Sequence, residues 1–156
     1  MNKLDKKSVI GISALLVHAA KIDEIYSDDE KILIKKFIKS YLKDDNEEDV
    51  LKAAEEIEKN SNQLLNFTNI IKKNDEETKS DIIKHLWEII ISDKTIDQYE
   101  SNLMRRICGL IYFSSYSLLD TNKYLFLCFF YNSYLTLNYK NLLCYNLINS
   151  SFQSLF

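Results

Sequence analysis

Apolar residues recur along most of the chain at the three- and four-residue steps of amphipathic helices. The pattern predicts six helices, at about residues 3–21, 28–42, 62–73, 74–92 and 98–110, with one more directly after the acidic run at 44–49. The positions expected to face the core include Ile32, Leu33, Phe37, Ile38 and Leu42 in the second helix and Leu64, Leu65, Phe67, Ile70 and Ile71 in the fourth. The sequence therefore predicts an all-α bundle.

The composition and the length of the chain both support this interpretation. The 156 residues include no proline and only two glycines, Gly11 and Gly109. Sandwiches and barrels need turn residues every 8 to 12 positions, which this chain does not supply. A chain of this length can bury a single core without disulfide or metal staples.

The last 43 residues have a different composition from the rest. Residues 114–156 contain only three charged side chains, Asp120, Lys123 and Lys140, but 11 of the chain's 19 aromatic residues. We therefore predict a helical domain at 1–113 and an atypical apolar tail at 114–156. The tail's apolar stretch is too short to span a bilayer.

Two hypotheses account for the tail. The first hypothesis is a reading-frame shift after about residue 113, or a truncated last helix. It rests on the tail's composition, because adenine- and thymine-rich codons specify Asn, Tyr, Phe, Leu, Ile and Lys. The other is a genuine extension that packs on the bundle, rests on a membrane or joins copies of the chain. The coding DNA distinguishes them, because a frameshift requires an alternative frame that encodes a charged amphipathic helix.

Two segments align without gaps when the sequence is shifted by 70 residues. Asp23 then meets Asp93, Ser27 meets Asp97, and Glu30 meets Glu100. Each copy consists of a helix, a short turn and another helix. The alignment predicts two related helical hairpins, whose carboxylates we expect on one surface patch.

The repeated acidic residues have two interpretations. Ser27 and Glu30 have the spacing of a capping box, as do Asp97 and Glu100, and capping needs no ligand. Asp23 follows an apolar helix, as does Asp93, where a carboxylate opposes the helix dipole. A divalent cation would reverse that penalty, although each aspartate could instead bond its own turn. Neither loop is an EF-hand, because both lack the required glycine and final glutamate.

The two hairpins, at residues 15–30 and 86–100, resemble the signature hairpins of the tellurite-resistance TerB family. In that family an apolar helix ends in Ala-Asp-Gly, and a glutamate follows seven residues after the aspartate. Asp23 with Glu30 and Asp93 with Glu100 have this spacing. The resemblance covers about residues 8–113.

The resemblance implies a bundle of six to seven helices with pseudo-symmetric halves and an acidic site for Ca²⁺ or a similar divalent cation. The metal-binding residues that it implies are Asp23, Glu30, Asp93, Asp97 and Glu100. It also implies a role beside other stress-response proteins near the inner membrane. The family's glycines are replaced here by Glu24 and Lys94, and Lys94 adds a positive charge beside the expected site.

Other features set the expected compartment and partners. Three cysteines without metal-ligand spacing favour the reduced cytoplasm. A signal peptide is the alternative for the apolar N-terminal segment, although cutting it off would destroy half of the repeat. The net charge of −3 gives no basic footprint for nucleic acid. We interpret the basic clusters, Lys35, Lys36 and Lys39 and also Arg105 and Arg106, as solvated helix faces.

Three functions remain for such a module. The first is a metal-binding regulatory domain of stress response, and the second is a protein-interaction scaffold whose acidic repeats are only helix caps. The third, a small metal-assisted hydrolase, has no obvious catalytic residues, so we expect no enzymatic activity. His18 and His85 lie within predicted helices, and we interpret them as satisfied core or surface histidines.

Overall fold

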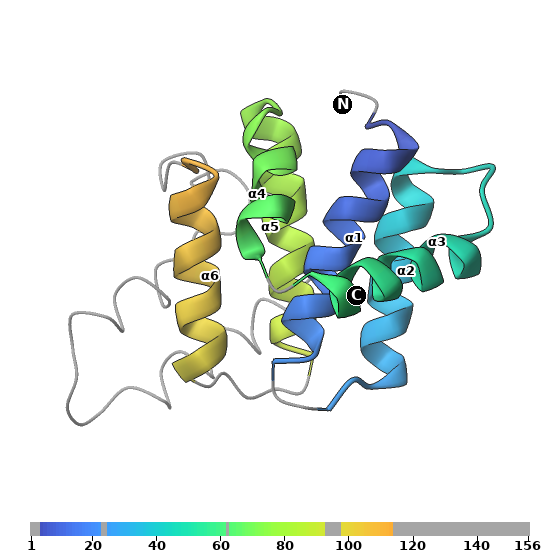
Figure 1. Cartoon of the computed structure of the whole chain (residues 1–156), viewed down its shortest axis with the longest axis horizontal. Coiled ribbons are helices and arrows are strands. Elements are labelled where there is room, and N and C mark those ends of the chain that lie inside the picture. Colours follow the sequence, from blue (N-terminus) through green and yellow to red (C-terminus); the bar gives the residue numbers. More distant parts are fainter. Residues whose placement is uncertain (1–3, 23–24, 62, 93–97, 114–156) are drawn as a thin grey trace, which may run out of the picture. The chain divides into compact units, whose positions relative to one another are not determined.

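The computed structural model describes residues 4–22, 25–61, 63–92 and 98–113. This part of the chain contains helices α1 (Lys6–Ala20), α2 (Asp28–Tyr41), α3 (Glu47–Asn60), α4 (Leu64–Lys72), α5 (Glu76–Ile90) and α6 (Gln98–Leu110) (Figure 1). The predicted all-α bundle is therefore confirmed, with each helix close to its expected range. A seventh helix and the predicted tail at 114–156 lie outside the described residues.

Helix α1 is the centre of the bundle. It packs against α2, α3, α4 and α5, whereas α6 packs against α4 and α5. Val9, Ile12, Leu15, Leu16 and Val17 of α1 are all inaccessible to solvent. A helix that is apolar on most sides must be enclosed by its neighbours, and this accounts for the central place of α1.

Side chains cap the starts of four helices. The carboxylate of Asp5 accepts a hydrogen bond from the backbone N–H of Ser8 at α1, and that of Asp75 accepts one from Thr78 at α5. The Asn46 side chain accepts from the N–H of Glu48 at α3. Each cap satisfies a backbone donor that the helix itself leaves unpaired. Ser27 caps α2 in the same way and belongs to the candidate site below.

The predicted inward faces are confirmed for most helices, with two corrections. Ile32 is 61% exposed, because the buried stripe of α2 follows Glu30, Ile34, Phe37 and Ile38, on the opposite side of the helix. Leu65 is 50% exposed, because the short helix α4 buries Leu64 and its neighbours one and two turns onward. In both helices the sequence offers more apolar side chains than one face can bury.

Helices α1 and α4 approach each other closely at Gly11. A Cβ atom built on Gly11 would lie 2.4 Å from Cδ1 of Ile70, which is closer than real Cβ contacts. The missing side chain therefore makes room for Ile70. This contact explains why Gly11 lies inside a helix, where glycine is otherwise unfavourable.

The end of α6 forms a Schellman motif without a glycine. The N–H of Phe113 donates to the carbonyl of Cys108 at 3.0 Å, and that of Tyr112 donates to Gly109 at 3.3 Å. Tyr112 has a φ of 53°, in the left-handed region that favours glycine. Its ring is exposed and lies under the ammonium of Lys72, 4.1 Å from the ring centroid.

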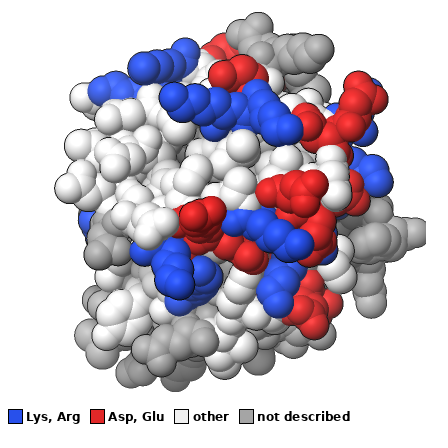
Figure 2. Space-filling model, turned by 45° about the vertical axis from the view of Figure 1, so that its right-hand side comes forward, with Lys and Arg blue, Asp and Glu red and all other residues white. Residues whose placement is uncertain are grey.

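Charged side chains of both signs are interleaved on the face shown in Figure 2. Two ion pairs join α2 to α3. Lys35 pairs with Glu48 at 2.5 Å, and Lys39 pairs with Glu47 at 3.8 Å. The lysines expected on a solvated face are thus largely neutralised. Among the described helices, none has the length and apolar character needed to cross a membrane.

Candidate functional site

The helix ends that flank the two repeated turns lie at the same end of the bundle. Helices α1 and α5 end there, and α2 and α6 begin there (Figure 1). Each hairpin consists of one central or buried helix followed by a more exposed one. The ends that carry the repeated acidic motif therefore belong to one region of the described fold.

Glu30 forms a complete capping box with Ser27. Its Oε2 accepts hydrogen bonds from the backbone N–H of Ser27 at 2.7 Å and from the Ser27 hydroxyl at 2.8 Å. In return, the N–H of Glu30 donates to Ser27 Oγ at 3.2 Å. The predicted capping role is confirmed, and it engages one carboxylate oxygen of the expected metal ligand.

Glu100 holds the same helical position as Glu30. Each is the third residue of its helix, α6 and α2 respectively, and each is only 7% exposed. Buried carboxylates are uncommon unless they have partners. The match in position and burial supports the 70-residue repeat beyond its sequence identities.

The other expected ligands, Asp23, Asp93 and Asp97, lie outside the described residues. Within the described ranges, no three Asp, Glu, His or Cys side chains come close enough together to hold a metal ion. A cation site of the expected kind must therefore include at least one of these three aspartates. Their convergence with Glu30 and Glu100 stays a prediction.

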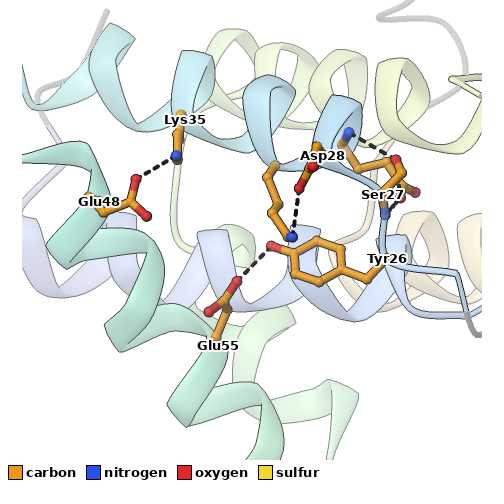
Figure 3. A network of polar contacts seen from close by, with 8 residues as sticks. Tyr26, Ser27, Asp28, Lys35, Glu48 and Glu55 are labelled. Carbon is orange, nitrogen blue, oxygen red and sulfur yellow. Dashed lines mark hydrogen bonds and ion pairs between the residues drawn. The ribbon is translucent and has the colours of Figure 1, made fainter.

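Tyr26 anchors the segment that enters α2 (Figure 3). Its hydroxyl donates a 3.0 Å hydrogen bond to Oε1 of Glu55 on α3. The ammonium of Lys31 lies 5.1 Å from the ring centroid, and that of Lys21 lies 5.7 Å from it. Burial and the bond to Glu55 both raise the pKa of Tyr26 well above its usual range. This anchor fixes the chain just after the predicted ligand Asp23, and nothing in the sequence motif signalled it.

A second anchor lies at the end of α1. Glu58 of α3 accepts a hydrogen bond from Lys21 at 2.7 Å, and its other oxygen is 3.2 Å from Nδ1 of His18. Burial alone would raise the pKa of Glu58, but the bonds from Lys21 and His18 outweigh it and lower the pKa. The interpretation of His18 as a histidine satisfied by its neighbours is thereby confirmed.

His85 is the buried member of a separate polar group. Its Nδ1 lies 3.4 Å from Glu88 Oε2 and its Nε2 lies 3.8 Å from Asp81 Oδ2. Tyr41 donates to the same Asp81 oxygen at 2.7 Å, and the Phe37 ring meets the imidazole edge-on. The interaction with His85 lowers the pKa of Glu88. This group ties α2 to α5 and lies among packed side chains, but the buried Nδ1 of His85 makes no hydrogen bond to the described residues, so the prediction of a fully satisfied histidine is not met.

A groove of about 620 Å³ lies between the end of α1 and the first half of α6. His18 and Ile22 line it from the α1 side, and residues of α6 from Tyr99 to Arg106 line the other. Both arginines of the chain are among them, although the sequence pattern suggested only a solvated helix face. The groove joins the two hairpins at the end where their acidic turns are expected.

The described helices define a small all-α module. The family model for the tellurite resistance protein TerB matches residues 10–120, which is more than half of the chain. The chain therefore belongs to the TerB family, as the two hairpins predicted. Comparisons with curated proteins and with solved structures returned no match.

Proposed function

We propose that this TerB-family chain is a regulatory module that binds a divalent cation weakly where α2 and α6 begin. The observation that carries the proposal is the equivalent placement of Glu30 and Glu100. Both carboxylates are buried, both are third in their helices, and both helices begin at the same end of the bundle. The aspartates at 23, 93 and 97 would complete the oxygen ligands that Ca²⁺ prefers.

The cation would act by joining the two hairpins. Carboxylates placed after α1 and α5 oppose the negative ends of those helix dipoles, and a bound cation would cancel that repulsion. The apolar core around α1 is extensive without any metal, so binding would adjust the end of the bundle rather than drive folding. Such an adjustment suits a non-catalytic role in which a cytoplasmic protein partner of the stress response reads the cation-bound surface.

A second candidate function is a protein-interaction scaffold without metal. The complete capping box of Ser27 and Glu30 favours it, because capping alone explains why this acidic residue is present. Under this hypothesis the same end of the bundle would contact a protein partner directly. The two candidates differ in one measurable property, which is the binding of a divalent ion.

Calorimetric titration of the full chain with Ca²⁺, Mg²⁺ and Mn²⁺ tests the proposal. We expect a dissociation constant of about 10⁻⁴ to 10⁻³ M for the preferred ion, as in weak calcium modules. Glu30→Gln is the most informative variant, because glutamine keeps the capping hydrogen bonds but lacks the charge. Asp23→Asn removes a ligand outside the cap, and Asp29→Asn is the matched control on an exposed neighbouring carboxylate.

The cation proposal predicts weaker binding in Glu30→Gln and Asp23→Asn and unchanged binding in Asp29→Asn. An absence of both heat and thermal shift at millimolar concentrations of all three ions would overturn it in favour of the scaffold. Equal weakening in all three variants would show only a diffuse attraction to negative charge.

A further inference from the structure

The groove between α1 and α6 combines apolar lining residues with exposed polar ones. Its volume of about 620 Å³ lies within the range of ligand pockets, about 300–1,000 Å³. Leu103, only 4% exposed, and Ile22 form an apolar lining. A few polar groups surround these apolar residues, as is usual where a ligand is held in one orientation.

The polar groups of the groove lie in order along one stripe of α6. Tyr99, Asn102 and Arg106 follow one another at steps of three and four residues, so they share one face of the helix. Tyr99 is 73% exposed and offers its ring. From Tyr99 to Arg106 the helix rises by roughly 10 Å, so a ring and a guanidinium group lie at opposite ends of the stripe.

The charged side chains among the described lining residues are basic. The sequence has 20 lysines and arginines, of which only Arg105 and Arg106 are arginines, and both line this groove. Arginine presents a planar fork of donors that fits a phosphate or carboxylate better than lysine does. His18, whose Nδ1 lies 3.2 Å from Glu58, lines the opposite side, and none of the described lining residues is acidic.

We propose that this groove binds a small phosphorylated ligand with a flat aromatic ring, of the chemical class of mononucleotides. The ring stacks on Tyr99, the amide of Asn102 meets polar atoms in the middle, and the phosphate binds Arg106 with help from Arg105. A nucleic-acid strand is disfavoured, because the chain is acidic overall and the charges on the face seen in Figure 2 are mixed. The site requires no metal, so the proposal stands apart from the cation site.

Titration of the full chain with AMP, GMP and inorganic phosphate, in EDTA at low salt, tests the proposal. EDTA removes divalent ions, so a failure here is distinct from a failure of cation binding. We expect saturable binding of at least one nucleotide and weaker binding of phosphate alone. Arg106→Gln should weaken nucleotide binding about tenfold or more, since it removes charge-assisted hydrogen bonds.

Matched variants separate the parts of the site. Tyr99→Ala should weaken binding of the nucleotide but not of phosphate, whereas Tyr99→Phe should retain both. Lys52→Gln removes one positive charge from the exposed surface of α3 and should change neither. Tyr99 and Arg106 are exposed, so circular dichroism should show these variants folded.

Three results would overturn the proposal. One is the absence of heat and of thermal shift at millimolar nucleotide. Another is unchanged affinity in Arg106→Gln, and a third is phosphate binding as tight as nucleotide binding, which would exclude a role for the ring.

Discussion

The Ser27 side chain accepts a hydrogen bond from the backbone N–H of Glu30, and the Glu30 carboxylate accepts one from the backbone N–H of Ser27. Together the two bonds cap the start of α2. The exchange leaves Glu30 only 7% exposed although it carries a charge. A residue of the predicted metal site thus has a structural role whether or not a metal binds. Substitutions there must separate the two roles.

Replacing Ser27 by alanine removes the acceptor for the N–H of Glu30, and we expect a loss of about 1 kcal/mol in the free energy of unfolding. Glu30→Gln should lose much less, since its amide oxygen can still accept from Ser27. Urea denaturation followed through the fluorescence of Trp87, the chain's single tryptophan, measures both. Equal stability of Ser27→Ala and the wild type would refute the capping role.

Acid should weaken the anchor at the end of α1. The folded-state pKa of Glu58 is lowered from 4.5, so its bonds to Lys21 and His18 contribute stability above that pH. This contribution is lost as the pH falls below 4.5 and through the lowered folded-state pKa. Glu58→Gln should therefore show a smaller loss of stability between about pH 5 and 3 than the wild type. Parallel stability curves for the two proteins would contradict this assignment.

Tyr112 should be a site where glycine stabilises the protein. A left-handed conformation costs a non-glycine residue roughly 1–2 kcal/mol, and the exposed contact with Lys72 returns about 0.5–1 kcal/mol. Tyr112→Gly should therefore raise the melting temperature slightly. Lys72→Gln should destabilise the wild type but not the Tyr112→Gly protein, and an equal effect in both would exclude the cation–π contact.

The close contact between Gly11 and Ile70 sets the effect of adding one methyl group. Alanine at position 11 favours the helix by about 0.5–1 kcal/mol, but its Cβ collides with Cδ1 of Ile70. Because that atom ends a flexible, only partly buried side chain, we expect Gly11→Ala to be nearly neutral and Gly11→Leu to be strongly destabilising. Adding Ile70→Val should improve Gly11→Ala relative to the sum of the single changes, as a double-mutant cycle in thermal unfolding can show.

The helical periodicity predicted each described helix well but not every inward side chain. In α5 the predicted set, Ile82, Ile83, Leu86, Trp87, Ile89 and Ile90, is buried throughout. The predictions for Ile32 and Leu65 were wrong because an apolar residue can lie on the exposed face of a helix at little cost in free energy. Hydrophobicity alone therefore does not decide which face such a residue occupies. Burial of the charged Glu30 was likewise not predicted from composition, although the capping motif implied its hydrogen bonds.

The candidate site was only partly visible in the sequence. The 70-residue repeat identified Glu30 and Glu100 because equivalent residues recur at one spacing. The groove was missed, because it forms between α1 and α6, which are far apart along the chain, and Arg105 with Arg106 alone matched a solvated face. The three-and-four spacing of Tyr99, Asn102 and Arg106 was the local signal that could have indicated it. The Tyr26–Glu55 bond left no local signal, since the two residues belong to different elements.

The central place of α1 has a consequence for how the chain is made. Helix α1 leaves the ribosome before the others, but α4 and α5, which cover much of its apolar surface, follow much later. At about 5–20 residues per second, synthesis from the end of α1 to the end of α5 takes roughly 4–14 seconds. Until α4 is made, α1 has only α2 and α3 to pack against. The nascent chain should therefore depend on holdase chaperones over this interval more than a bundle built from consecutive hairpins would.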